Sequence, residues 1–289
     1  VKTSLSLKNG DSDIDVILNL DSELRSLKTQ SNSMRSQRNK SSELIATIMK
    51  EKGDAEELIK ETRLLGDQLK NIDKVINDVQ IKLKSELLKL PNPPLENVPK
   101  GKDSDGNIEI RSWGDKPVFS FEPKTHLELN EKLCFIDFKR GSKISGSGFP
   151  LFTGQGAKLE RRLINAMVDH HCTLFNSKEV FPPVLMTKES MLTTGQLPKF
   201  QDDMYHTEVD NLFLAPTAEV PVTNIHRDEI IDEGKLPINY VAYSPCFRRE
   251  SGSYGKDTRG LLRVHQFNKV ELVKFSAPET SLLELEKIT

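Results

Sequence analysis

A long stretch without proline, from Ile17 to Leu90, is the feature that most constrains how this chain can fold. Within this stretch, two series of mostly apolar side chains recur at steps of three and four residues, the spacing of coiled-coil heptads. At residues 51–54 the pattern shifts, and there Gly53 can end one helix while Asp54 can cap the next. The stretch therefore predicts an antiparallel hairpin of two helices, each on the order of 50 Å long. The first seam comprises Ile17, Leu20, Leu24, Leu27, Ser31, Met34, Arg38, Ser41, Ile45 and Ile48, and the second comprises Leu58, Thr62, Leu65, Leu69, Ile72, Ile76, Val79, Leu83 and Leu90.

The first predicted helix carries a basic run, residues 25–42, that contains no acidic residue. Its cations are Arg25, Lys28, Arg35, Arg38 and Lys40. Such a face can follow the phosphate backbone of a nucleic acid. Charge alone also fits a solvated face, and the hairpin alone also fits a dimerisation or spacer coiled coil.

Proline-rich segments predict where the helical hairpin ends. Residues 91–94, Pro-Asn-Pro-Pro, stop the second helix, and residues 99–106 have the composition of an exposed linker. The predicted organisation is a helical arm over 1–91, a linker over 92–106 and a second domain over 107–289. In that domain Gln155 to Phe175 predicts one amphipathic helix, with Leu159, Leu163, Ala166, Met167 and His170 at helical spacing, and a strand is expected from Glu179 to Leu185.

Composition excludes several classes of protein. The net charge of −2 is nearly neutral, so any contact with nucleic acid has to come from a local patch. No apolar run approaches about 18 residues, so we expect no membrane span. Cys134, Cys172 and Cys246 are isolated and odd in number, which argues against a disulfide framework and favours a reducing, cytoplasmic location. Adjacent side chains on a helix diverge, so we assign no metal site to His170-His171-Cys172.

Two β-rich runs, Tyr240 to Phe247 and Leu261 to Phe275, predict a hairpin with a Gly- and Ser-rich connection. In the second run, alternation places cationic, aromatic and acidic side chains on one face: Arg263, His265, Phe267, Lys269 and Glu271. Arginine can bind two phosphate oxygens at once, Phe267 can stack on a base, and Glu250 can accept hydrogen bonds. Spacing alone fits a triphosphate site or a solvated sheet face with cross-strand ion pairs.

The residues of this hairpin resemble motif 2 of class II aminoacyl-tRNA synthetases, in the form found in seryl-tRNA synthetases. The resemblance rests on residues 248–250 (Arg-Arg-Glu), 257–267 (Asp-Thr-Arg-Gly-Leu-Leu-Arg-Val-His-Gln-Phe) and 269–271 (Lys-Val-Glu). Upstream, residues 194–200 resemble another segment of that family, and Thr217-Ala218-Glu219 resembles its serine-binding loop. The order of the segments matches over nearly the whole chain.

The resemblance implies an α+β fold: an N-terminal antiparallel two-helix coiled-coil arm followed by a class II antiparallel-sheet catalytic domain. It also implies activation of L-serine with ATP and Mg²⁺ and transfer of the seryl group to tRNA(Ser) by a homodimer. Arg248 and Arg263 are then catalytic, and no residue is assigned as a metal ligand. The remaining implied contacts are Thr217, Ala218, Glu219 and Glu271 for serine; Arg248, Arg249, Glu250, Val264 and Phe267 for ATP; Arg25, Lys28, Arg35, Arg38 and Lys40 for tRNA; and Pro183 for the dimer interface.

One part of the family pattern is missing from the sequence. No motif 3, a late Gly-rich strand and helix with an arginine for the γ-phosphate, is found before Thr289. We therefore expect the catalytic domain to be incomplete and the chain alone not to be a competent ligase. The alternative is a non-catalytic tRNA-binding relative. The retained substrate residues, among them Thr217, Arg248 and Glu271, argue against that alternative.

Overall fold

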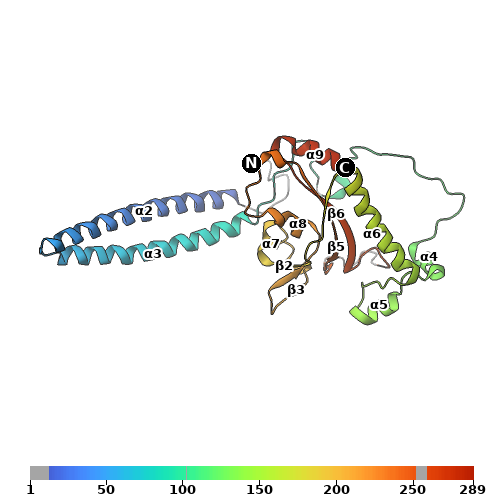
Figure 1. Ribbon diagram of the computed structural model, residues 1–289, viewed down its shortest axis with the longest axis horizontal. Helices are drawn as coiled ribbons and strands as arrows, with labels where there is room; N and C mark the ends of the chain where they lie inside the picture. The colour runs from blue at the N-terminus through green and yellow to red at the C-terminus, as the bar shows by residue number, and fades with distance from the viewer. Residues whose placement is uncertain (1–12, 102, 252–258) are drawn as a thin grey trace. The chain divides into compact units, whose positions relative to one another are not determined.

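The structure, a computed structural model, describes residues 13–101, 103–251 and 259–289 (Figure 1). The chain divides into two compact units, Val1–Gly114 and Asp115–Thr289. The first unit contains the helical arm, and the second contains two small β-sheets with their covering helices. Each unit is described by itself below.

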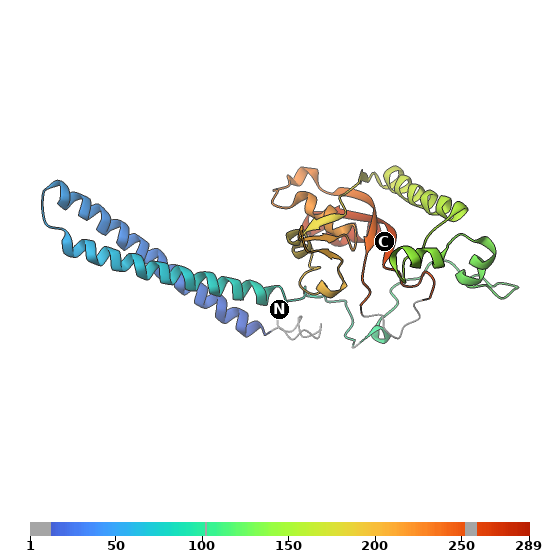
Figure 2. The same ribbon diagram turned by 90° about the horizontal axis from the view of Figure 1, so that it is seen from below.

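The arm is an antiparallel hairpin of α2 (Ile14–Lys50) and α3 (Glu56–Leu87), whose two helices run side by side in both views (Figures 1 and 2). The Asp54 side chain accepts a hydrogen bond from the backbone N–H of Glu56, the first residue of α3, at 2.9 Å, although Ala55 and not Asp54 occupies the N-cap position. The end of α2 differs from the prediction, because Lys52 and not Gly53 takes the left-handed conformation, with φ of 55°. Gly53 is required for space instead: a Cβ there would lie 2.9 Å from the Ile48 side chain.

The predicted heptad seams form the contact between the two helices. Ile17, Leu24 and Ser31 are buried on α2, and Leu69 and Val79 are buried on α3. Burying these faces supplies most of the stability of such a helix pair, because a long helix in water gains little from propensity alone. Arg38 departs from the predicted seam, since its side chain is exposed to solvent.

A polar layer interrupts the apolar seam near the middle of the arm. The buried Ser31 hydroxyl donates to the Asp73 carboxylate at 3.1 Å, and the Arg35 guanidinium donates to the other Asp73 oxygen at 2.7 Å. Arg35 also holds the pKa of Asp73 below its usual value. The layer joins the two helices through a directional contact, which apolar packing does not provide.

The second unit is organised around a three-stranded sheet in the order β1-β5-β6. β5 (Ile238–Phe247) and β6 (Gln266–Phe275) are antiparallel and pair residue for residue, and β1 (Lys178–Val180) runs parallel to β5. Helix α6 (Gly154–Phe175) packs against this sheet (Figure 1). Ala218, Val222, Tyr240 and Ala242 form a buried cluster of the unit.

A second sheet has the order β2-β4-β3, with antiparallel strands β2 (Leu185–Thr187), β3 (His206–Thr207) and β4 (Leu212–Leu214). Its apolar side packs with α7 (Lys188–Thr193) in a second core cluster. The members of that cluster are Met186, Met191, Leu197, Met204, Phe213, Ala215 and Val220. The remaining helices are α4 (His126–Leu133), α5 (Phe138–Ser145), α8 (Glu219–Thr223) and α9 (Ser281–Ile288), with 3₁₀ turns at 104–106, 201–203, 224–226, 233–235 and 278–280.

Two expectations about this unit were wrong in detail. The strand expected to start at Leu261 starts at Gln266, because residues before it bond to other segments: the His265 N–H donates to the Gly148 carbonyl at 2.9 Å. The strand expected over 179–185 is split into β1 and β2 by Pro182 and Pro183, which lack the N–H that a ladder needs. The helix predicted over 155–175 agrees with α6, and its apolar stripe that includes Leu163 is exposed.

We predict that Leu69→Ala destabilises the arm by about 2–4 kcal/mol, because Leu69 is only 3% exposed between the helices and the change leaves a cavity. Leu64→Ala, on the same helix where Leu64 is 62% exposed, is the matched control and should change stability by about 0.5 kcal/mol or less. Hydrogen exchange of the α2 and α3 amides measures both. Equal effects of the two variants would contradict the seam described here.

Candidate active site

A cavity of about 350 Å³ opens where the β5–β6 hairpin meets the segment before α8. We call it the site cavity. Its walls combine two arginines, one lysine, four carboxylates and a buried hydroxyl, so it is suited to a polar, charged ligand. It is lined by Gln196, Phe200, Asp203, Met204, Pro216, Thr217, Glu219, Arg248, Glu250, Arg263, Lys269 and Glu271.

At one end of the site cavity, Thr217, Lys269 and Glu271 form a hydrogen-bonded cluster. The Thr217 hydroxyl donates to Glu271 Oε2 at 2.7 Å and accepts from Lys269 Nζ at 2.7 Å. Lys269 Nζ lies 2.9 Å from the same carboxylate oxygen, and the backbone N–H of Glu219 donates to it at 3.0 Å. Lys269 and Glu271 share a face of β6 because they are two residues apart. The cluster therefore presents a fixed carboxylate to a ligand.

Arg248 lies beside this cluster, directly after β5. Its Nε donates to the Pro216 carbonyl at 3.1 Å, and its guanidinium lies over the Phe267 ring, 5.2 Å from the ring centre. These contacts fix the plane of the guanidinium, whose remaining N–H groups can bind a carboxylate or phosphate. The alternation predicted for β6 accounts for this contact, because Phe267 and Lys269 lie on the same face of the strand.

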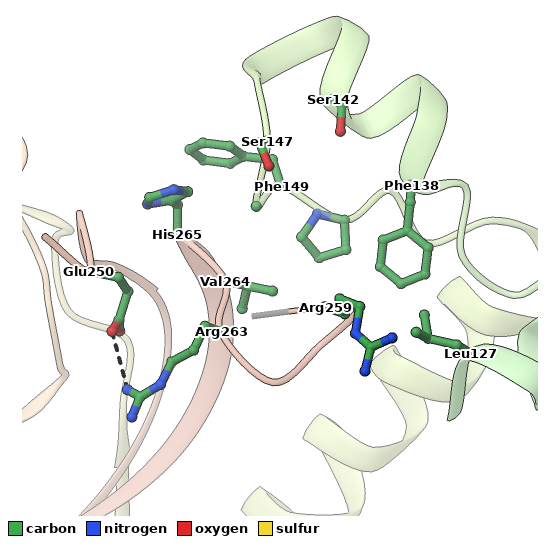
Figure 3. A pocket seen from close by; sticks show the side chains of 13 residues that line it. Leu127, Phe138, Ser142, Ser147, Phe149, Glu250, Arg259, Arg263, Val264 and His265 are labelled. Atoms are coloured by element: carbon green, nitrogen blue, oxygen red, sulfur yellow. Dashed lines mark hydrogen bonds and ion pairs between the residues drawn. The ribbon is translucent and has the colours of Figure 1, made fainter. Parts of the chain in front are cut away.

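Glu250 and Arg263 form the boundary between the site cavity and a second cavity of about 530 Å³. Arg263 Nη1 donates to Glu250 Oε2 at 3.2 Å, and Figure 3 shows these two side chains turned toward each other. Glu250 has φ of 51°, an uncommon left-handed conformation for a residue other than glycine. His265 lines the second cavity and stacks on Phe149, with ring centres 5.2 Å apart (Figure 3).

Asp203 is a site residue that the sequence analysis missed. Its carboxylate accepts from the Ser251 backbone N–H at 2.9 Å and from the Ser251 hydroxyl at 2.6 Å. Hydrogen bonds from Ser251 hold the pKa of Asp203 below its usual value. The Asp203 carbonyl also accepts from the Arg249 N–H at 2.9 Å. Asp203 therefore holds the backbone that carries Arg248 and Glu250, a contact between distant segments that no local pattern reveals.

The structure brings some of the predicted substrate residues to the site cavity and not others. Thr217, Glu219, Arg248, Glu250, Arg263 and Glu271 line it. Arg249 is exposed and lines neither this cavity nor the second one, and Ala218 is fully buried in the core. Val264 and Phe267 line a neighbouring cavity of about 260 Å³. The roles of these residues stay predictions.

The basic run of the arm lies beside a groove of about 450 Å³ formed by both helices. Arg35 and Arg38 from α2 and Arg63 and Lys70 from α3 line it, and the position of Gly66 leaves open space. Two carboxylates also line the groove: Asp73 pairs with Arg35 at 2.7 Å and Asp67 pairs with Lys70 at 3.1 Å. Arg25 pairs with Asp21 one turn earlier at 2.8 Å. The α3 cations do not belong to the basic run in the sequence, because they lie on the other helix and reach the groove only in the folded arm.

An apolar surface occupies the outer side of α6. Leu159, Leu163 and Met167 are each nearly half exposed there, and Phe181, two residues before Pro183, is 78% exposed. The side of α6 that packs inward carries Gly156 and Val168 instead. The helix thus has two apolar faces, of which one lies against the sheet of this chain.

Among the described residues, no group of three or more His, Cys, Asp or Glu side chains could hold a metal ion. Within the same ranges, no helix is both long enough and apolar enough to cross a membrane. Cys134, Cys172 and Cys246 are free thiols. The cytoplasmic location inferred from these cysteines stays a prediction.

Comparison with known proteins places both units in one family. Residues 1–94 match the seryl-tRNA synthetase N-terminal domain, and residues 200–289 match the class II tRNA synthetase core domain of the G, H, P, S and T types. The chain is 48% identical over 289 residues to the serine–tRNA ligase of Carboxydothermus hydrogenoformans, covering 100% of this chain and 68% of that protein. It is 50% identical over 290 residues to the enzyme of Geobacillus kaustophilus, again covering 100% of this chain and 68% of the relative.

A solved structure agrees with these sequence relatives. Seryl-tRNA synthetase from Pyrococcus horikoshii, complexed with ATP, superposes with a TM-score of 0.84 at 34% identity, over 95% of this chain and 66% of that chain. The chain therefore spans about two thirds of the length of the proteins it matches. The helical arm and the antiparallel-sheet unit expected from the sequence are both confirmed by this agreement.

Proposed function

The chain belongs to the seryl-tRNA synthetase family, and on that premise we propose that it forms the serine-, ATP- and tRNA-binding part of a ligase that activates L-serine with ATP and transfers the seryl group to the 3′ end of tRNA(Ser), while the chain alone is not expected to complete the reaction. The observation that carries the proposal is the site cavity, in which the Glu271–Thr217–Lys269 cluster faces the Arg248 guanidinium. A fixed carboxylate suits an ammonium group, and a fixed guanidinium suits a carboxylate or phosphate. A free amino acid and a nucleotide supply these groups.

In the first step, a carboxylate oxygen of serine attacks the α-phosphorus of ATP. The bond from that phosphorus to the bridging oxygen breaks, and pyrophosphate leaves with its electron pair. Arg248 is proposed to bind the serine carboxylate and the α-phosphate together, which would bring the reacting atoms close and stabilise the charge that develops. In the second step, a terminal ribose hydroxyl of the tRNA attacks the seryl carbonyl and AMP leaves.

The nucleotide is proposed to lie along Arg248, Glu250 and Phe267. Glu250 can accept from an adenine amino group, and Phe267 can stack on the base. Arg263, which pairs with Glu250, can reach the phosphates of the nucleotide. Because the described residues contain no cluster that could hold a metal by itself, Mg²⁺ is proposed to enter on the triphosphate, where it neutralises phosphate charge.

We predict that Arg248→Ala weakens ATP binding roughly ten- to a hundredfold, because hydrogen bonds to charged groups are worth about 1.5–3 kcal/mol. Arg249→Ala is the matched control. It removes the same charge from an exposed side chain outside the site cavity. On this geometry it should change ATP affinity by less than threefold, in contrast to the ATP contact that the resemblance implies for Arg249. Titration calorimetry with ATP measures both variants. If Arg249→Ala causes the larger loss, the phosphate contact has been assigned to the wrong arginine.

The tRNA is proposed to bind along the basic groove of the arm. Two of the predicted α2 cations, Arg35 and Arg38, line the groove with Arg63 and Lys70 of α3. Asp67 and Asp73 also line it, so its four cations exceed its carboxylates by two. The proposal rests on charge, on the open space at Gly66 and on family membership. Lys28 and Lys40 lie on the same helix as Arg35 and Arg38, within the basic run.

We predict that changing Lys28, Arg38 and Lys40 together to Gln weakens binding of tRNA(Ser) and leaves ATP affinity unchanged. Each lost duplex-like phosphate contact should also lower the slope of log affinity against log salt by about 0.9. Gln substitutions at Lys74, Lys82 and Lys84, exposed on α3 outside the groove, change the net charge equally and serve as the control. An identical loss in both triple variants would mean that general charge, and not this groove, attracts the tRNA.

The outer face of α6 is proposed to form a homodimer interface that includes the region of Pro183. A row of exposed apolar side chains on a folded surface is typical of a contact with another protein, and a second copy supplies the same apolar row.

We predict that Leu163→Glu halves the mass measured by sedimentation at micromolar concentration, whereas Asn165→Glu, on another side of the helix, does not. A monomeric unmodified chain under the same conditions would contradict the interface.

A further inference from the structure

The contacts of Glu271 fall on one of its two carboxylate oxygens. Oε2 accepts from the Thr217 hydroxyl, from the Glu219 N–H and from Lys269 Nζ. No hydrogen bond from the described residues reaches Oε1. Three donors therefore hold the carboxylate by one oxygen, while the other remains available to a ligand in the site cavity.

Lys269 also contacts the hydroxyl that bonds to Glu271. A lysine ammonium has only donors, so the Thr217 oxygen accepts from it at 2.7 Å. The Glu271 carboxylate only accepts, so the single hydroxyl proton of Thr217 points to Oε2 at 2.7 Å. Lys269 thus donates to both Thr217, which is 4% exposed, and Glu271. Its ammonium group therefore helps to hold both side chains in the positions they present to the site cavity.

We propose that Lys269 is a positioning residue for amino-acid recognition: it holds Oε2 of Glu271 and the Thr217 hydroxyl, so that Oε1 receives the ammonium group of the substrate. The inference rests on the proposed function and deepens it. The Lys269 ammonium, 2.9 Å from Oε2, also offsets the negative charge of a carboxylate whose side chain is only 20% exposed.

A competing interpretation predicts the opposite change in amino-acid affinity when the Lys269 ammonium is removed. Lys269 Nζ could occupy the place of the substrate ammonium and have to leave before the amino acid binds. Removing the ammonium would then tighten binding. Under the positioning role, removing it loosens Glu271 and Thr217 and weakens binding, because a mobile carboxylate has to be ordered again by each ligand.

The test uses Lys269→Met, which keeps the length of the side chain and removes its donors. Titration calorimetry with L-serine should show binding ten- to a hundredfold weaker, with ATP affinity changed by less than threefold. Lys269→Arg, which restores donors, should recover part of the serine affinity. Lys188→Met, at an exposed position of the same unit, controls for loss of a lysine. Unchanged or tighter serine binding in Lys269→Met would overturn the proposal.

A second measurement needs no ligand. The Glu219 amide bonds to Glu271 Oε2, so its hydrogen exchange reports whether that oxygen is held. Exchange at Glu219 should be at least tenfold faster in Lys269→Met and unchanged in Lys188→Met, with circular dichroism unaltered in both. If the unmodified chain binds no serine, the proposed function fails for this chain. Unchanged Glu219 exchange would then still overturn the role of Lys269 independently.

Discussion

The antiparallel pairing of β5 with β6 is the constraint on which the second unit depends. Each residue of β5 has a partner in β6, from Ile238 opposite Phe275 to Phe247 opposite Gln266. This register places Lys269 and Glu271 on the face that meets Thr217, and it brings Arg248 to the Phe267 ring. A slip of one residue would turn the charged side chains of β6 to the opposite face. The site cavity thus depends first on the pairing of β5 with β6, because that pairing determines which side chains line it.

Much of this arrangement could be predicted from the sequence because it depends on local periodicity. Heptad spacing predicted the two helices of the arm, and alternation predicted that Phe267, Lys269 and Glu271 share a face. The residues before β6 show where periodicity fails. The Leu261 N–H donates to His126 Nε2 at 3.0 Å and the His265 N–H donates to Gly148, so partners far away in the chain replace the ladder there.

Two other features could not be predicted for related reasons. Apolar spacing identified α6 as amphipathic, but it could not distinguish the face that packs on the sheet from the face that stays exposed, since both carry apolar residues. Asp203 lies in a 3₁₀ turn among ordinary polar residues, and only the folded chain brings it to Ser251. Sequence periodicity shows which residues share a face of a helix or strand. Which segment that face packs against depends on how the whole unit folds.

The polar layer at Ser31, Arg35 and Asp73 favours one register of the two arm helices. Sliding one helix by a heptad would preserve most apolar contacts, but it would separate the Asp73 carboxylate from Ser31 and Arg35, and in one direction it would set that carboxylate opposite Leu24. The Asp73 side chain is 43% exposed, so the penalty is the loss of these hydrogen bonds and not the burial of a charge. The layer therefore distinguishes one register from others that apolar packing would tolerate, and with it the residues of α2 and α3 that lie opposite each other along the arm.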